Sequence, residues 1–157
     1  MERSDFTVHG VKTFRGMEGR GYNATIKYKG KKVAEVIDDA TGGELSIEWA
    51  DSGYHNFGEL TPLESEICDF AEGLPCEEIL GHKVECCVEM FFEDLVEDYL
   101  ENQSLKRKCR TKILYRDDKD DIYAIDAAPP VTPEIRAKIK SWGGVEVIND
   151  RFAKPQA

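Results

Sequence analysis

The first third of the chain alternates hydrophobic and polar residues with a period of two, which is typical of half-buried β-strands. The alternation is clearest where Tyr22, Ala24 and Ile26 are separated by polar residues. Glycine-rich and aspartate-rich turns divide this region into four strands, expected at residues 5–14, 22–30, 32–38 and 44–50. The pattern predicts a four-stranded antiparallel meander with one apolar face, followed by a loop at 51–60.

The middle third changes to a helical pattern, in which apolar residues recur every three or four positions. Thr61 is a good N-cap, and Pro62 suits the first position of a helix. Glu64 completes a capping box, so a helix is expected at 62–72. A longer amphipathic helix is expected at 83–102, with an apolar stripe made of Val84, Cys87, Val88, Phe91, Phe92, Leu95 and Tyr99.

The last third predicts a β-hairpin at 111–116 and 121–126, because turn-forming residues separate two apolar runs. A threonine followed by a proline predicts a third helix at 133–141, and a last strand is expected at 145–149, before a short tail. Together the elements predict an α+β fold, in which the long helix packs across the apolar face of the meander. The hairpin and the last strand either extend that sheet or form a small second one.

The chain has 157 residues, enough for one domain with a sizeable core, so a single domain is expected over 1–157. Its parts are the β meander at 1–58, an acidic helical segment at 59–104, and the hairpin, helix and final strand at 105–157. The net charge is −10, but the middle of the chain carries more than this excess. Residues 59–101 contain fourteen acidic residues and one basic residue, which gives −13.

The N-terminal residues contain no apolar signal core, and no apolar run approaches the roughly 20 residues that a bilayer-spanning helix needs. The five cysteines are odd in number and two of them are adjacent, which favours reduced thiols over a disulfide framework. We therefore expect a protein of the cytoplasm that has no membrane association and no cofactor.

Residues 14–24, FRGMEGRGYNA, form a glycine-rich connection between two expected strands. They resemble a phosphate-binding loop in composition only, because the P-loop ending is missing and a strand follows where a helix is required. Glycines also let a hairpin loop adopt positive φ at little cost. A loop on a rigid sheet is a common place for binding, and partner contacts are expected from Arg15, Met17, Glu18 and Arg20.

Candidate metal ligands and catalytic residues are present but lack a diagnostic arrangement. One group has a spacing that matches no usual zinc motif: Cys76, His82, Cys86 and Cys87. The aspartates at 38–39 and within 117–121 lack the ligand pattern of an EF-hand and are explained by turns. His55 is the best candidate for an acid or base, but nothing around it completes a catalytic site. We expect no metal and no catalytic residue, which favours a non-enzymatic role.

The long helix carries a row of acidic residues at one-turn spacing, with no lysine between them. Like charges at this spacing repel each other by about 0.2–0.5 kcal/mol per pair. A solvated face that serves solubility explains the row most simply. A more specific hypothesis is that the acidic surface mimics nucleic acid and competes with it for a basic groove. The acidic face consists of Glu85, Glu89, Glu93, Asp94, Glu97, Asp98 and Glu101.

Residues 106–112 bring together five basic residues, a composition that can hold phosphate. The simpler explanation is a set of cations at a helix C-terminus, where the helix dipole favours them, followed by the exposed face of a strand. The negative net charge disfavours nucleic acid as the main partner.

Residues 14–49, together with the C-terminal motifs IYAID, VTPEIRAKI and GGVEVIN, resemble small uncharacterised proteins encoded by phages and prophages. The resemblance brings no assigned activity and no catalytic residues. It implies a context in which small acidic proteins bind host machinery, including inhibitors of CRISPR and other defence systems, in the cytoplasm of the host cell.

The residues and the resemblance together leave three hypotheses open. The first is a phage-type accessory protein that binds and inhibits or modulates a host protein, such as a nucleic-acid-binding defence complex, through its acidic surface. The second is a small-ligand or nucleotide-binding protein, or an enzyme, that uses the glycine-rich loop at 15–21. The third is a structural or assembly component.

Overall fold

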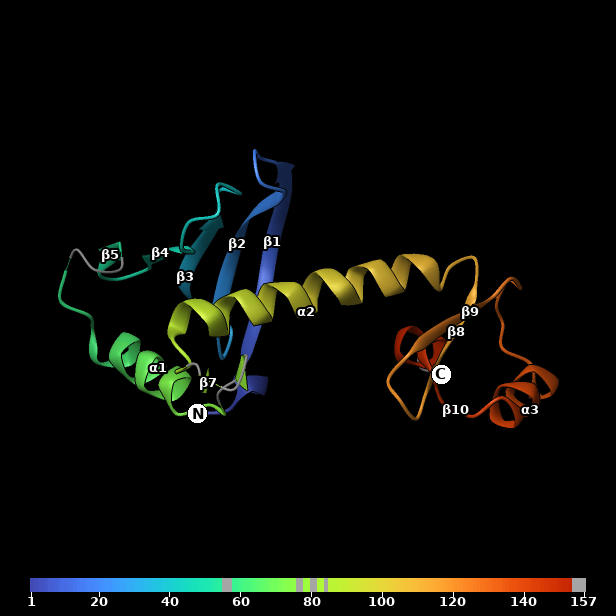
Figure 1. Cartoon of the computed structure of the whole chain (residues 1–157). Coiled ribbons are helices and arrows are strands. Elements are labelled where there is room, and N and C mark those ends of the chain that lie inside the picture. Colours follow the sequence, from blue (N-terminus) through green and yellow to red (C-terminus); the bar gives the residue numbers. More distant parts are fainter. Residues whose placement is uncertain (55–57, 76–77, 80–81, 84, 154–157) are drawn as a thin grey trace. The chain divides into compact units, whose positions relative to one another are not determined.

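The computed structural model describes residues 1–54, 58–75, 78–79, 82–83 and 85–153 (Figure 1). The protein belongs to the α+β class, as the sequence predicts. Residue contacts divide the chain into two compact units, Met1–Tyr99 and Leu100–Ala157, which we call unit 1 and unit 2. The single-domain organisation stays a prediction.

The strands of unit 1 form an antiparallel meander in the order β1-β2-β3-β4-β5. They are β1 (Phe6–Arg15), β2 (Arg20–Tyr28), β3 (Lys31–Asp38), β4 (Ser46–Trp49) and β5 (Gly53–Tyr54), and a short 3-10 turn, η1 (Arg3–Asp5), precedes them. The prediction of four strands was wrong by one, because β5 lies in the segment expected to be loop. β5 pairs with Glu48 and Trp49 of β4, and two residues are too few to show an alternating pattern.

Helix α1 (Pro62–Glu72) has the predicted bounds, because its start is encoded locally. The Thr61 hydroxyl accepts a hydrogen bond from the backbone N–H of Glu64, and the Glu64 carboxylate accepts one from the N–H of Thr61 at 2.8 Å. Glu64 is only 2% exposed. Its Oε1 also accepts from the backbone N–H groups of Asp51 and Ser52, both at 3.3 Å, so the capping box joins α1 to the turn after β4.

Helix α2 (Val88–Lys108) starts and ends later than the predicted 83–102. His82–Lys83 instead form strand β7, which pairs with β6 (Glu78–Ile79), and residues 85–87 are not helical. At its other end the helix continues through three cations, which suit the negative end of the helix dipole.

The buried side of α2 follows most of the predicted stripe. Its buried residues in unit 1 are Val88, Phe91, Phe92, Leu95 and also Val96, which the prediction omitted. Cys87 precedes the helix, and Val84 lies outside the described residues.

The core of unit 1 lies between the apolar face of the meander and the first half of α2 (Figure 1). Tyr22, Ala24 and Ile26 are buried there, as their alternation predicts. The ring centroids of Trp49 and Phe92 lie 5.7 Å apart in an edge-on contact. This aromatic contact joins β4 directly to α2.

Unit 2 has its own three-stranded antiparallel sheet in the order β10-β8-β9. Its strands are β8 (Ile113–Asp117), β9 (Ile122–Ile125) and β10 (Gly144–Val147). Of the two arrangements left open by the sequence, the structure shows the small second sheet. Helix α3 (Pro133–Ser141) has its predicted bounds. A 3-10 helix, η2 (Ile148–Phe152), follows β10 where the end of a strand and a tail were expected.

Two small apolar clusters pack against the sheet of unit 2. One joins α3 to β8 and consists of Ile113, Tyr115 and Ile139. The other joins the end of α2 to β8 and η2 and consists of Leu105, Cys109, Leu114 and Ile148. Alternate residues of β8 enter different clusters because successive side chains of a strand point to opposite faces.

A buried side-chain amide ties three segments of unit 2 together. Asn149 is 9% exposed, and its Oδ1 accepts a hydrogen bond from the backbone N–H of Leu114 at 2.7 Å. Its Nδ2 donates to the carbonyl oxygens of Cys109 at 3.2 Å and Lys112 at 3.0 Å. These bonds fix η2 against β8 and against the C-terminal end of α2.

Candidate functional site

The glycine-rich loop is a tight hairpin connection and is shorter than the sequence predicted. β1 and β2 remain paired as far as Arg15, which lies opposite Arg20. Within the loop the backbone N–H of Gly16 donates to the carbonyl oxygen of Gly19 at 2.9 Å. Only residues 16–19 therefore lie outside the two strands.

Two glycines of this region allow a close approach to the end of β3 and to the residues that follow it. A Cβ atom at Gly16 would lie 2.5 Å from the Cβ of Ala40, and one at Gly21 would overlap the carbonyl oxygen of Asp38. The backbone N–H of Glu18 donates to the carbonyl oxygen of Ala40 at 2.9 Å. Backbone packing therefore explains these glycines without a bound phosphate.

The packed loop forms one wall of a cleft of about 620 Å³, which we call the acidic cleft. The segment between β3 and β4 and the start of α2 form its other walls. The carboxylates that line it are those of Glu18, Asp38, Glu44, Glu89 and Glu93. Arg20 is the single basic residue among the described residues that line the cleft. The glycine-rich loop and the acidic helix, which the sequence singled out separately, therefore meet at one site.

Negative charge accumulates in the acidic cleft at an energetic cost. Burial raises the pKa of the Glu93 carboxyl. The charges of neighbouring carboxylates raise it further, and Glu97 has the largest effect among them. Burial also raises the pKa of the Tyr22 hydroxyl, and the charges of Glu93 and Asp38 add to this effect. The Tyr22 hydroxyl has no hydrogen-bond partner within the described part of the chain. A cation bound in the cleft would relieve this repulsion.

The acidic face predicted for the long helix differs from expectation at its N-terminal end. Glu85 is not on the helix, because it precedes α2 in a non-helical segment. Glu89 is half-buried at the cleft, and the exposed members of the face are Glu93, Asp94, Glu97, Asp98 and Glu101. The carboxylate of Asp98 forms an ion pair with Arg3 at 2.6 Å. Glu101 belongs to unit 2, so the acidic face is divided between the two units.

The four loop residues predicted to touch a partner fall into two groups. Glu18 and Arg20 line the acidic cleft. Arg15 and Met17 are exposed beside it, with Met17 93% exposed. A contact with a partner stays a prediction for all four residues.

The remaining candidates from the sequence do not form a site in the parts that the structure describes. His55 and Cys76 lie outside those parts. Burial raises the pKa of the Cys87 thiol, which disfavours the reactive thiolate, and the Cys86 thiol donates to the carbonyl oxygen of Pro75 at 3.6 Å. Across the described ranges, no group of three or more His, Cys, Asp and Glu side chains is arranged to hold a metal ion.

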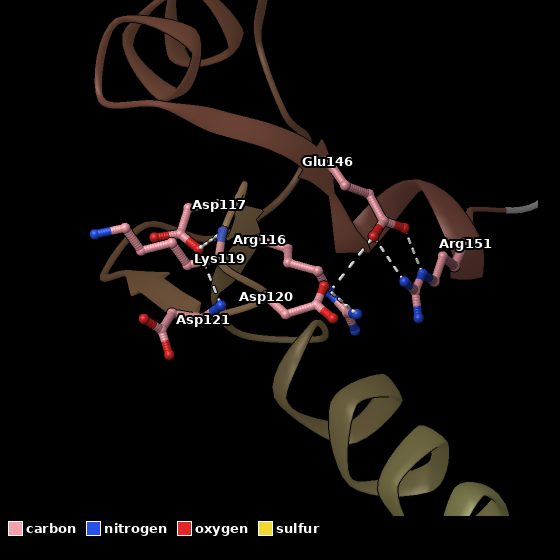
Figure 2. A network of polar contacts seen from close by, with 7 residues as sticks. All are labelled: Arg116, Asp117, Lys119, Asp120, Asp121, Glu146 and Arg151. Atoms are coloured by element: carbon pink, nitrogen blue, oxygen red, sulfur yellow. Dashed lines mark hydrogen bonds and ion pairs between the residues drawn. The ribbon is translucent and has the colours of Figure 1, made fainter.

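The aspartate-rich turn between β8 and β9 has a structural explanation (Figure 2). Oδ1 of Asp117 accepts hydrogen bonds from the backbone N–H groups of Lys119 and Asp121, each at 2.9 Å. Asp120 forms an ion pair with Arg116 at 3.1 Å. Figure 2 also shows ion pairs that join β8 to β10 and β10 to η2. These carboxylates therefore stabilise the turn and the sheet of unit 2.

No helix in the described ranges is both long and apolar enough to cross a membrane. Comparisons of the chain with protein-family models, with curated proteins and with solved structures find no match. Functional inference therefore rests on the geometry and charge of this chain.

Proposed function

We propose that the protein is a non-enzymatic binding protein that captures a basic surface of a partner protein at its acidic cleft. The observation that supports this proposal is the convergence of five carboxylates, from three separate segments of unit 1, around one cleft. Packing of the loop against the segment after β3, and of α2 across the meander, brings them together although like charges repel. Such an arrangement favours a ligand that supplies the missing positive charge.

An arginine or lysine side chain of the partner is the ligand that fits this chemistry. A cation about 4 Å from one carboxylate gains roughly 4 kcal/mol at the effective dielectric near a protein surface, before desolvation is subtracted. A guanidinium is the better match, because its fork of N–H donors can satisfy two carboxylate oxygens at once. A bound cation would also offset the repulsion from neighbouring carboxylates that raises the pKa of Glu93 in the free protein.

The exposed carboxylates of α2 extend this surface beyond the cleft. Asp94 and Glu97 are exposed beyond Glu93 on the same helix. A basic groove large enough to cover both the cleft and this helix face is the kind of surface that normally holds nucleic acid. The protein would then act by competition, and the resemblance to phage proteins makes a host defence complex of the CRISPR type the candidate partner.

The charge of the cleft bears on the alternative hypotheses. A nucleotide phosphate at the 15–21 loop would face five carboxylates and one arginine, an arrangement that repels it. The backbone N–H groups of Gly16 and Glu18 already donate to carbonyl oxygens, so they are not available to an anion. A structural or assembly role stays a prediction, which the oligomeric state in solution would begin to test.

Two matched triple variants test the proposed function. In the cleft variant, Glu18, Glu44 and Glu93 are changed to glutamine. In the control variant, three exposed acids of α1 are changed instead: Glu66→Gln, Asp69→Asn and Glu72→Gln. Both variants remove three negative charges from unit 1, so they differ only in where the charge is lost.

The measurement is titration with a short arginine-rich peptide near physiological salt, followed by capture from a host lysate with the same three proteins. The cleft variant should bind the peptide at least about tenfold more weakly, which corresponds to about 1.4 kcal/mol, and should lose the captured partner. The control should change by less than about threefold, because surface charges beyond a Debye length are screened. Equal weakening in both variants would show a nonspecific charge effect and would refute the proposal.

A further inference from the structure

A second cavity, in unit 2, has the opposite charge. It has a volume of about 470 Å³ and lies between the end of α2, the 129–131 segment, α3 and η2. Its basic residues are Lys106, Arg110 and Arg136, and its apolar wall includes Pro130, Val131 and Phe152. Unit 2 as a whole contains twelve basic and nine acidic residues, whereas unit 1 contains nine basic and twenty-two acidic residues.

The positive charge of this cavity is only partly neutralised. Arg136 forms two hydrogen bonds with Asp150, both at 2.7 Å, so these two charges cancel. Lys106 and Arg110 form no ion pair with any residue that the structure describes. An adjoining hollow of about 270 Å³ is also lined by Lys106 and Arg110, and Arg107 adds a third cation there.

Polar contacts hold the walls of the cavity in place. The three hydrogen bonds of Asn149 fix η2 against the end of α2, which carries Lys106 and precedes Arg110. The paired hydrogen bonds between Arg136 and Asp150 fix α3 against η2. The segments that carry the cations and the apolar wall are therefore held together before any ligand arrives, which reduces the entropy cost of binding.

We propose that this cavity binds a nucleotide phosphate. The phosphate would lie between Lys106 and Arg110, where a guanidinium can donate two parallel hydrogen bonds to phosphate oxygens. The flat ring would lie against the apolar wall near Phe152. The volume is within the range of roughly 300–1,000 Å³ that is usual for small-ligand sites.

The position at a helix C-terminus works against an anion, because the end of the helix dipole carries about half a negative charge. Three cations at this end outweigh that partial charge. The sequence offered two places for a phosphate, the 15–21 loop and the basic residues at 106–112, and the distribution of charge favours the second, which lies in unit 2. The inference does not depend on the proposed function, because the two sites lie in different units and attract opposite charges.

The test is calorimetric titration of the full chain with adenosine monophosphate, inorganic phosphate and a short single-stranded oligonucleotide. Lys106→Gln and Arg110→Gln are the site variants, and both side chains are exposed, so the fold should be kept. Lys138→Gln and Lys140→Gln on α3 are matched controls, because they remove the same charge from unit 2 outside both hollows.

Adenosine monophosphate should bind more tightly than inorganic phosphate, and each site variant should weaken it at least about tenfold, against less than about twofold for the controls. Tighter binding of the oligonucleotide than of the mononucleotide would identify a nucleic-acid strand as the source of the phosphate. The proposal is overturned if none of the three probes binds at millimolar concentration or if site and control variants weaken binding equally.

Discussion

The buried amide of Asn149 gives the most direct test of the architecture of unit 2. We predict that Asn149→Ala destabilises this unit by about 3 kcal/mol, because it removes three hydrogen bonds that each contribute about 1 kcal/mol. The N–H of Leu114 would also be left buried without a partner, at a cost of roughly 1–3 kcal/mol that overlaps with the lost bond. The total cost therefore stays at about 3 kcal/mol.

Hydrogen exchange of individual backbone amides, followed by NMR, measures this effect where it occurs. A loss of 3 kcal/mol corresponds to roughly a hundredfold faster exchange of the β8 amides, Leu114 included, if they exchange through opening of unit 2. Amides of β2 and β3 in unit 1 should keep their rates. Ser104→Ala, an exposed change on α2, is the control and should stay within about 0.5 kcal/mol of the unchanged protein.

A second variant separates the hydrogen bonds from the size of the side chain. Asn149→Asp keeps an acceptor for Leu114 but loses both donated bonds and places a negative charge beside the carbonyl oxygens of Cys109 and Lys112. It should destabilise unit 2 at least as much as the alanine variant at neutral pH. Unchanged exchange at Leu114 in both variants would refute the role given to Asn149.

Three further predictions concern unit 1. Gly21→Ala should destabilise it by about 1–3 kcal/mol in urea unfolding, because the new Cβ overlaps the carbonyl oxygen of Asp38, whereas Gly43→Ala, which has space, should change little. Burial alone would raise the pKa of Glu64, but hydrogen bonds, led by that from the Thr61 backbone, lower it below its ordinary value. These hydrogen bonds stabilise the folded protein fully at pH values above the ordinary carboxyl pKa, and this stability is lost as the pH falls through the lowered pKa of Glu64. In Glu64→Gln, the free energy of unfolding, measured in urea at a series of pH values, should therefore fall less at acid pH. Because the pKa of Glu93 is raised, ionisation costs stability as pH rises above the ordinary carboxyl value, and Glu93→Gln should raise the melting temperature at pH 7 but not at pH 4.

The sequence by itself determined those elements whose signals are local. The bounds of α1 follow from Thr61, Pro62 and Glu64, which lie within one turn of each other, and α3 starts by the same rule. The alternation around Ala24 also identified the buried face of β2 correctly. For the two helices, the free energy that selects the start comes from neighbours in the chain. For β2, the alternation marks which face will be buried, whichever segment covers it.

The tertiary structure decided whatever depends on distant segments. β5 exists because it finds a partner in β4, and Lys83, the expected first residue of the long helix, lies in β7 because that strand pairs with β6. The acidic cleft was invisible in the sequence, because Glu18 meets Ala40 only when the loop folds back onto the segment after β3. Contacts of this kind are selected by packing between residues far apart in the chain, and hydrophobic periodicity carries no information about which segments will meet.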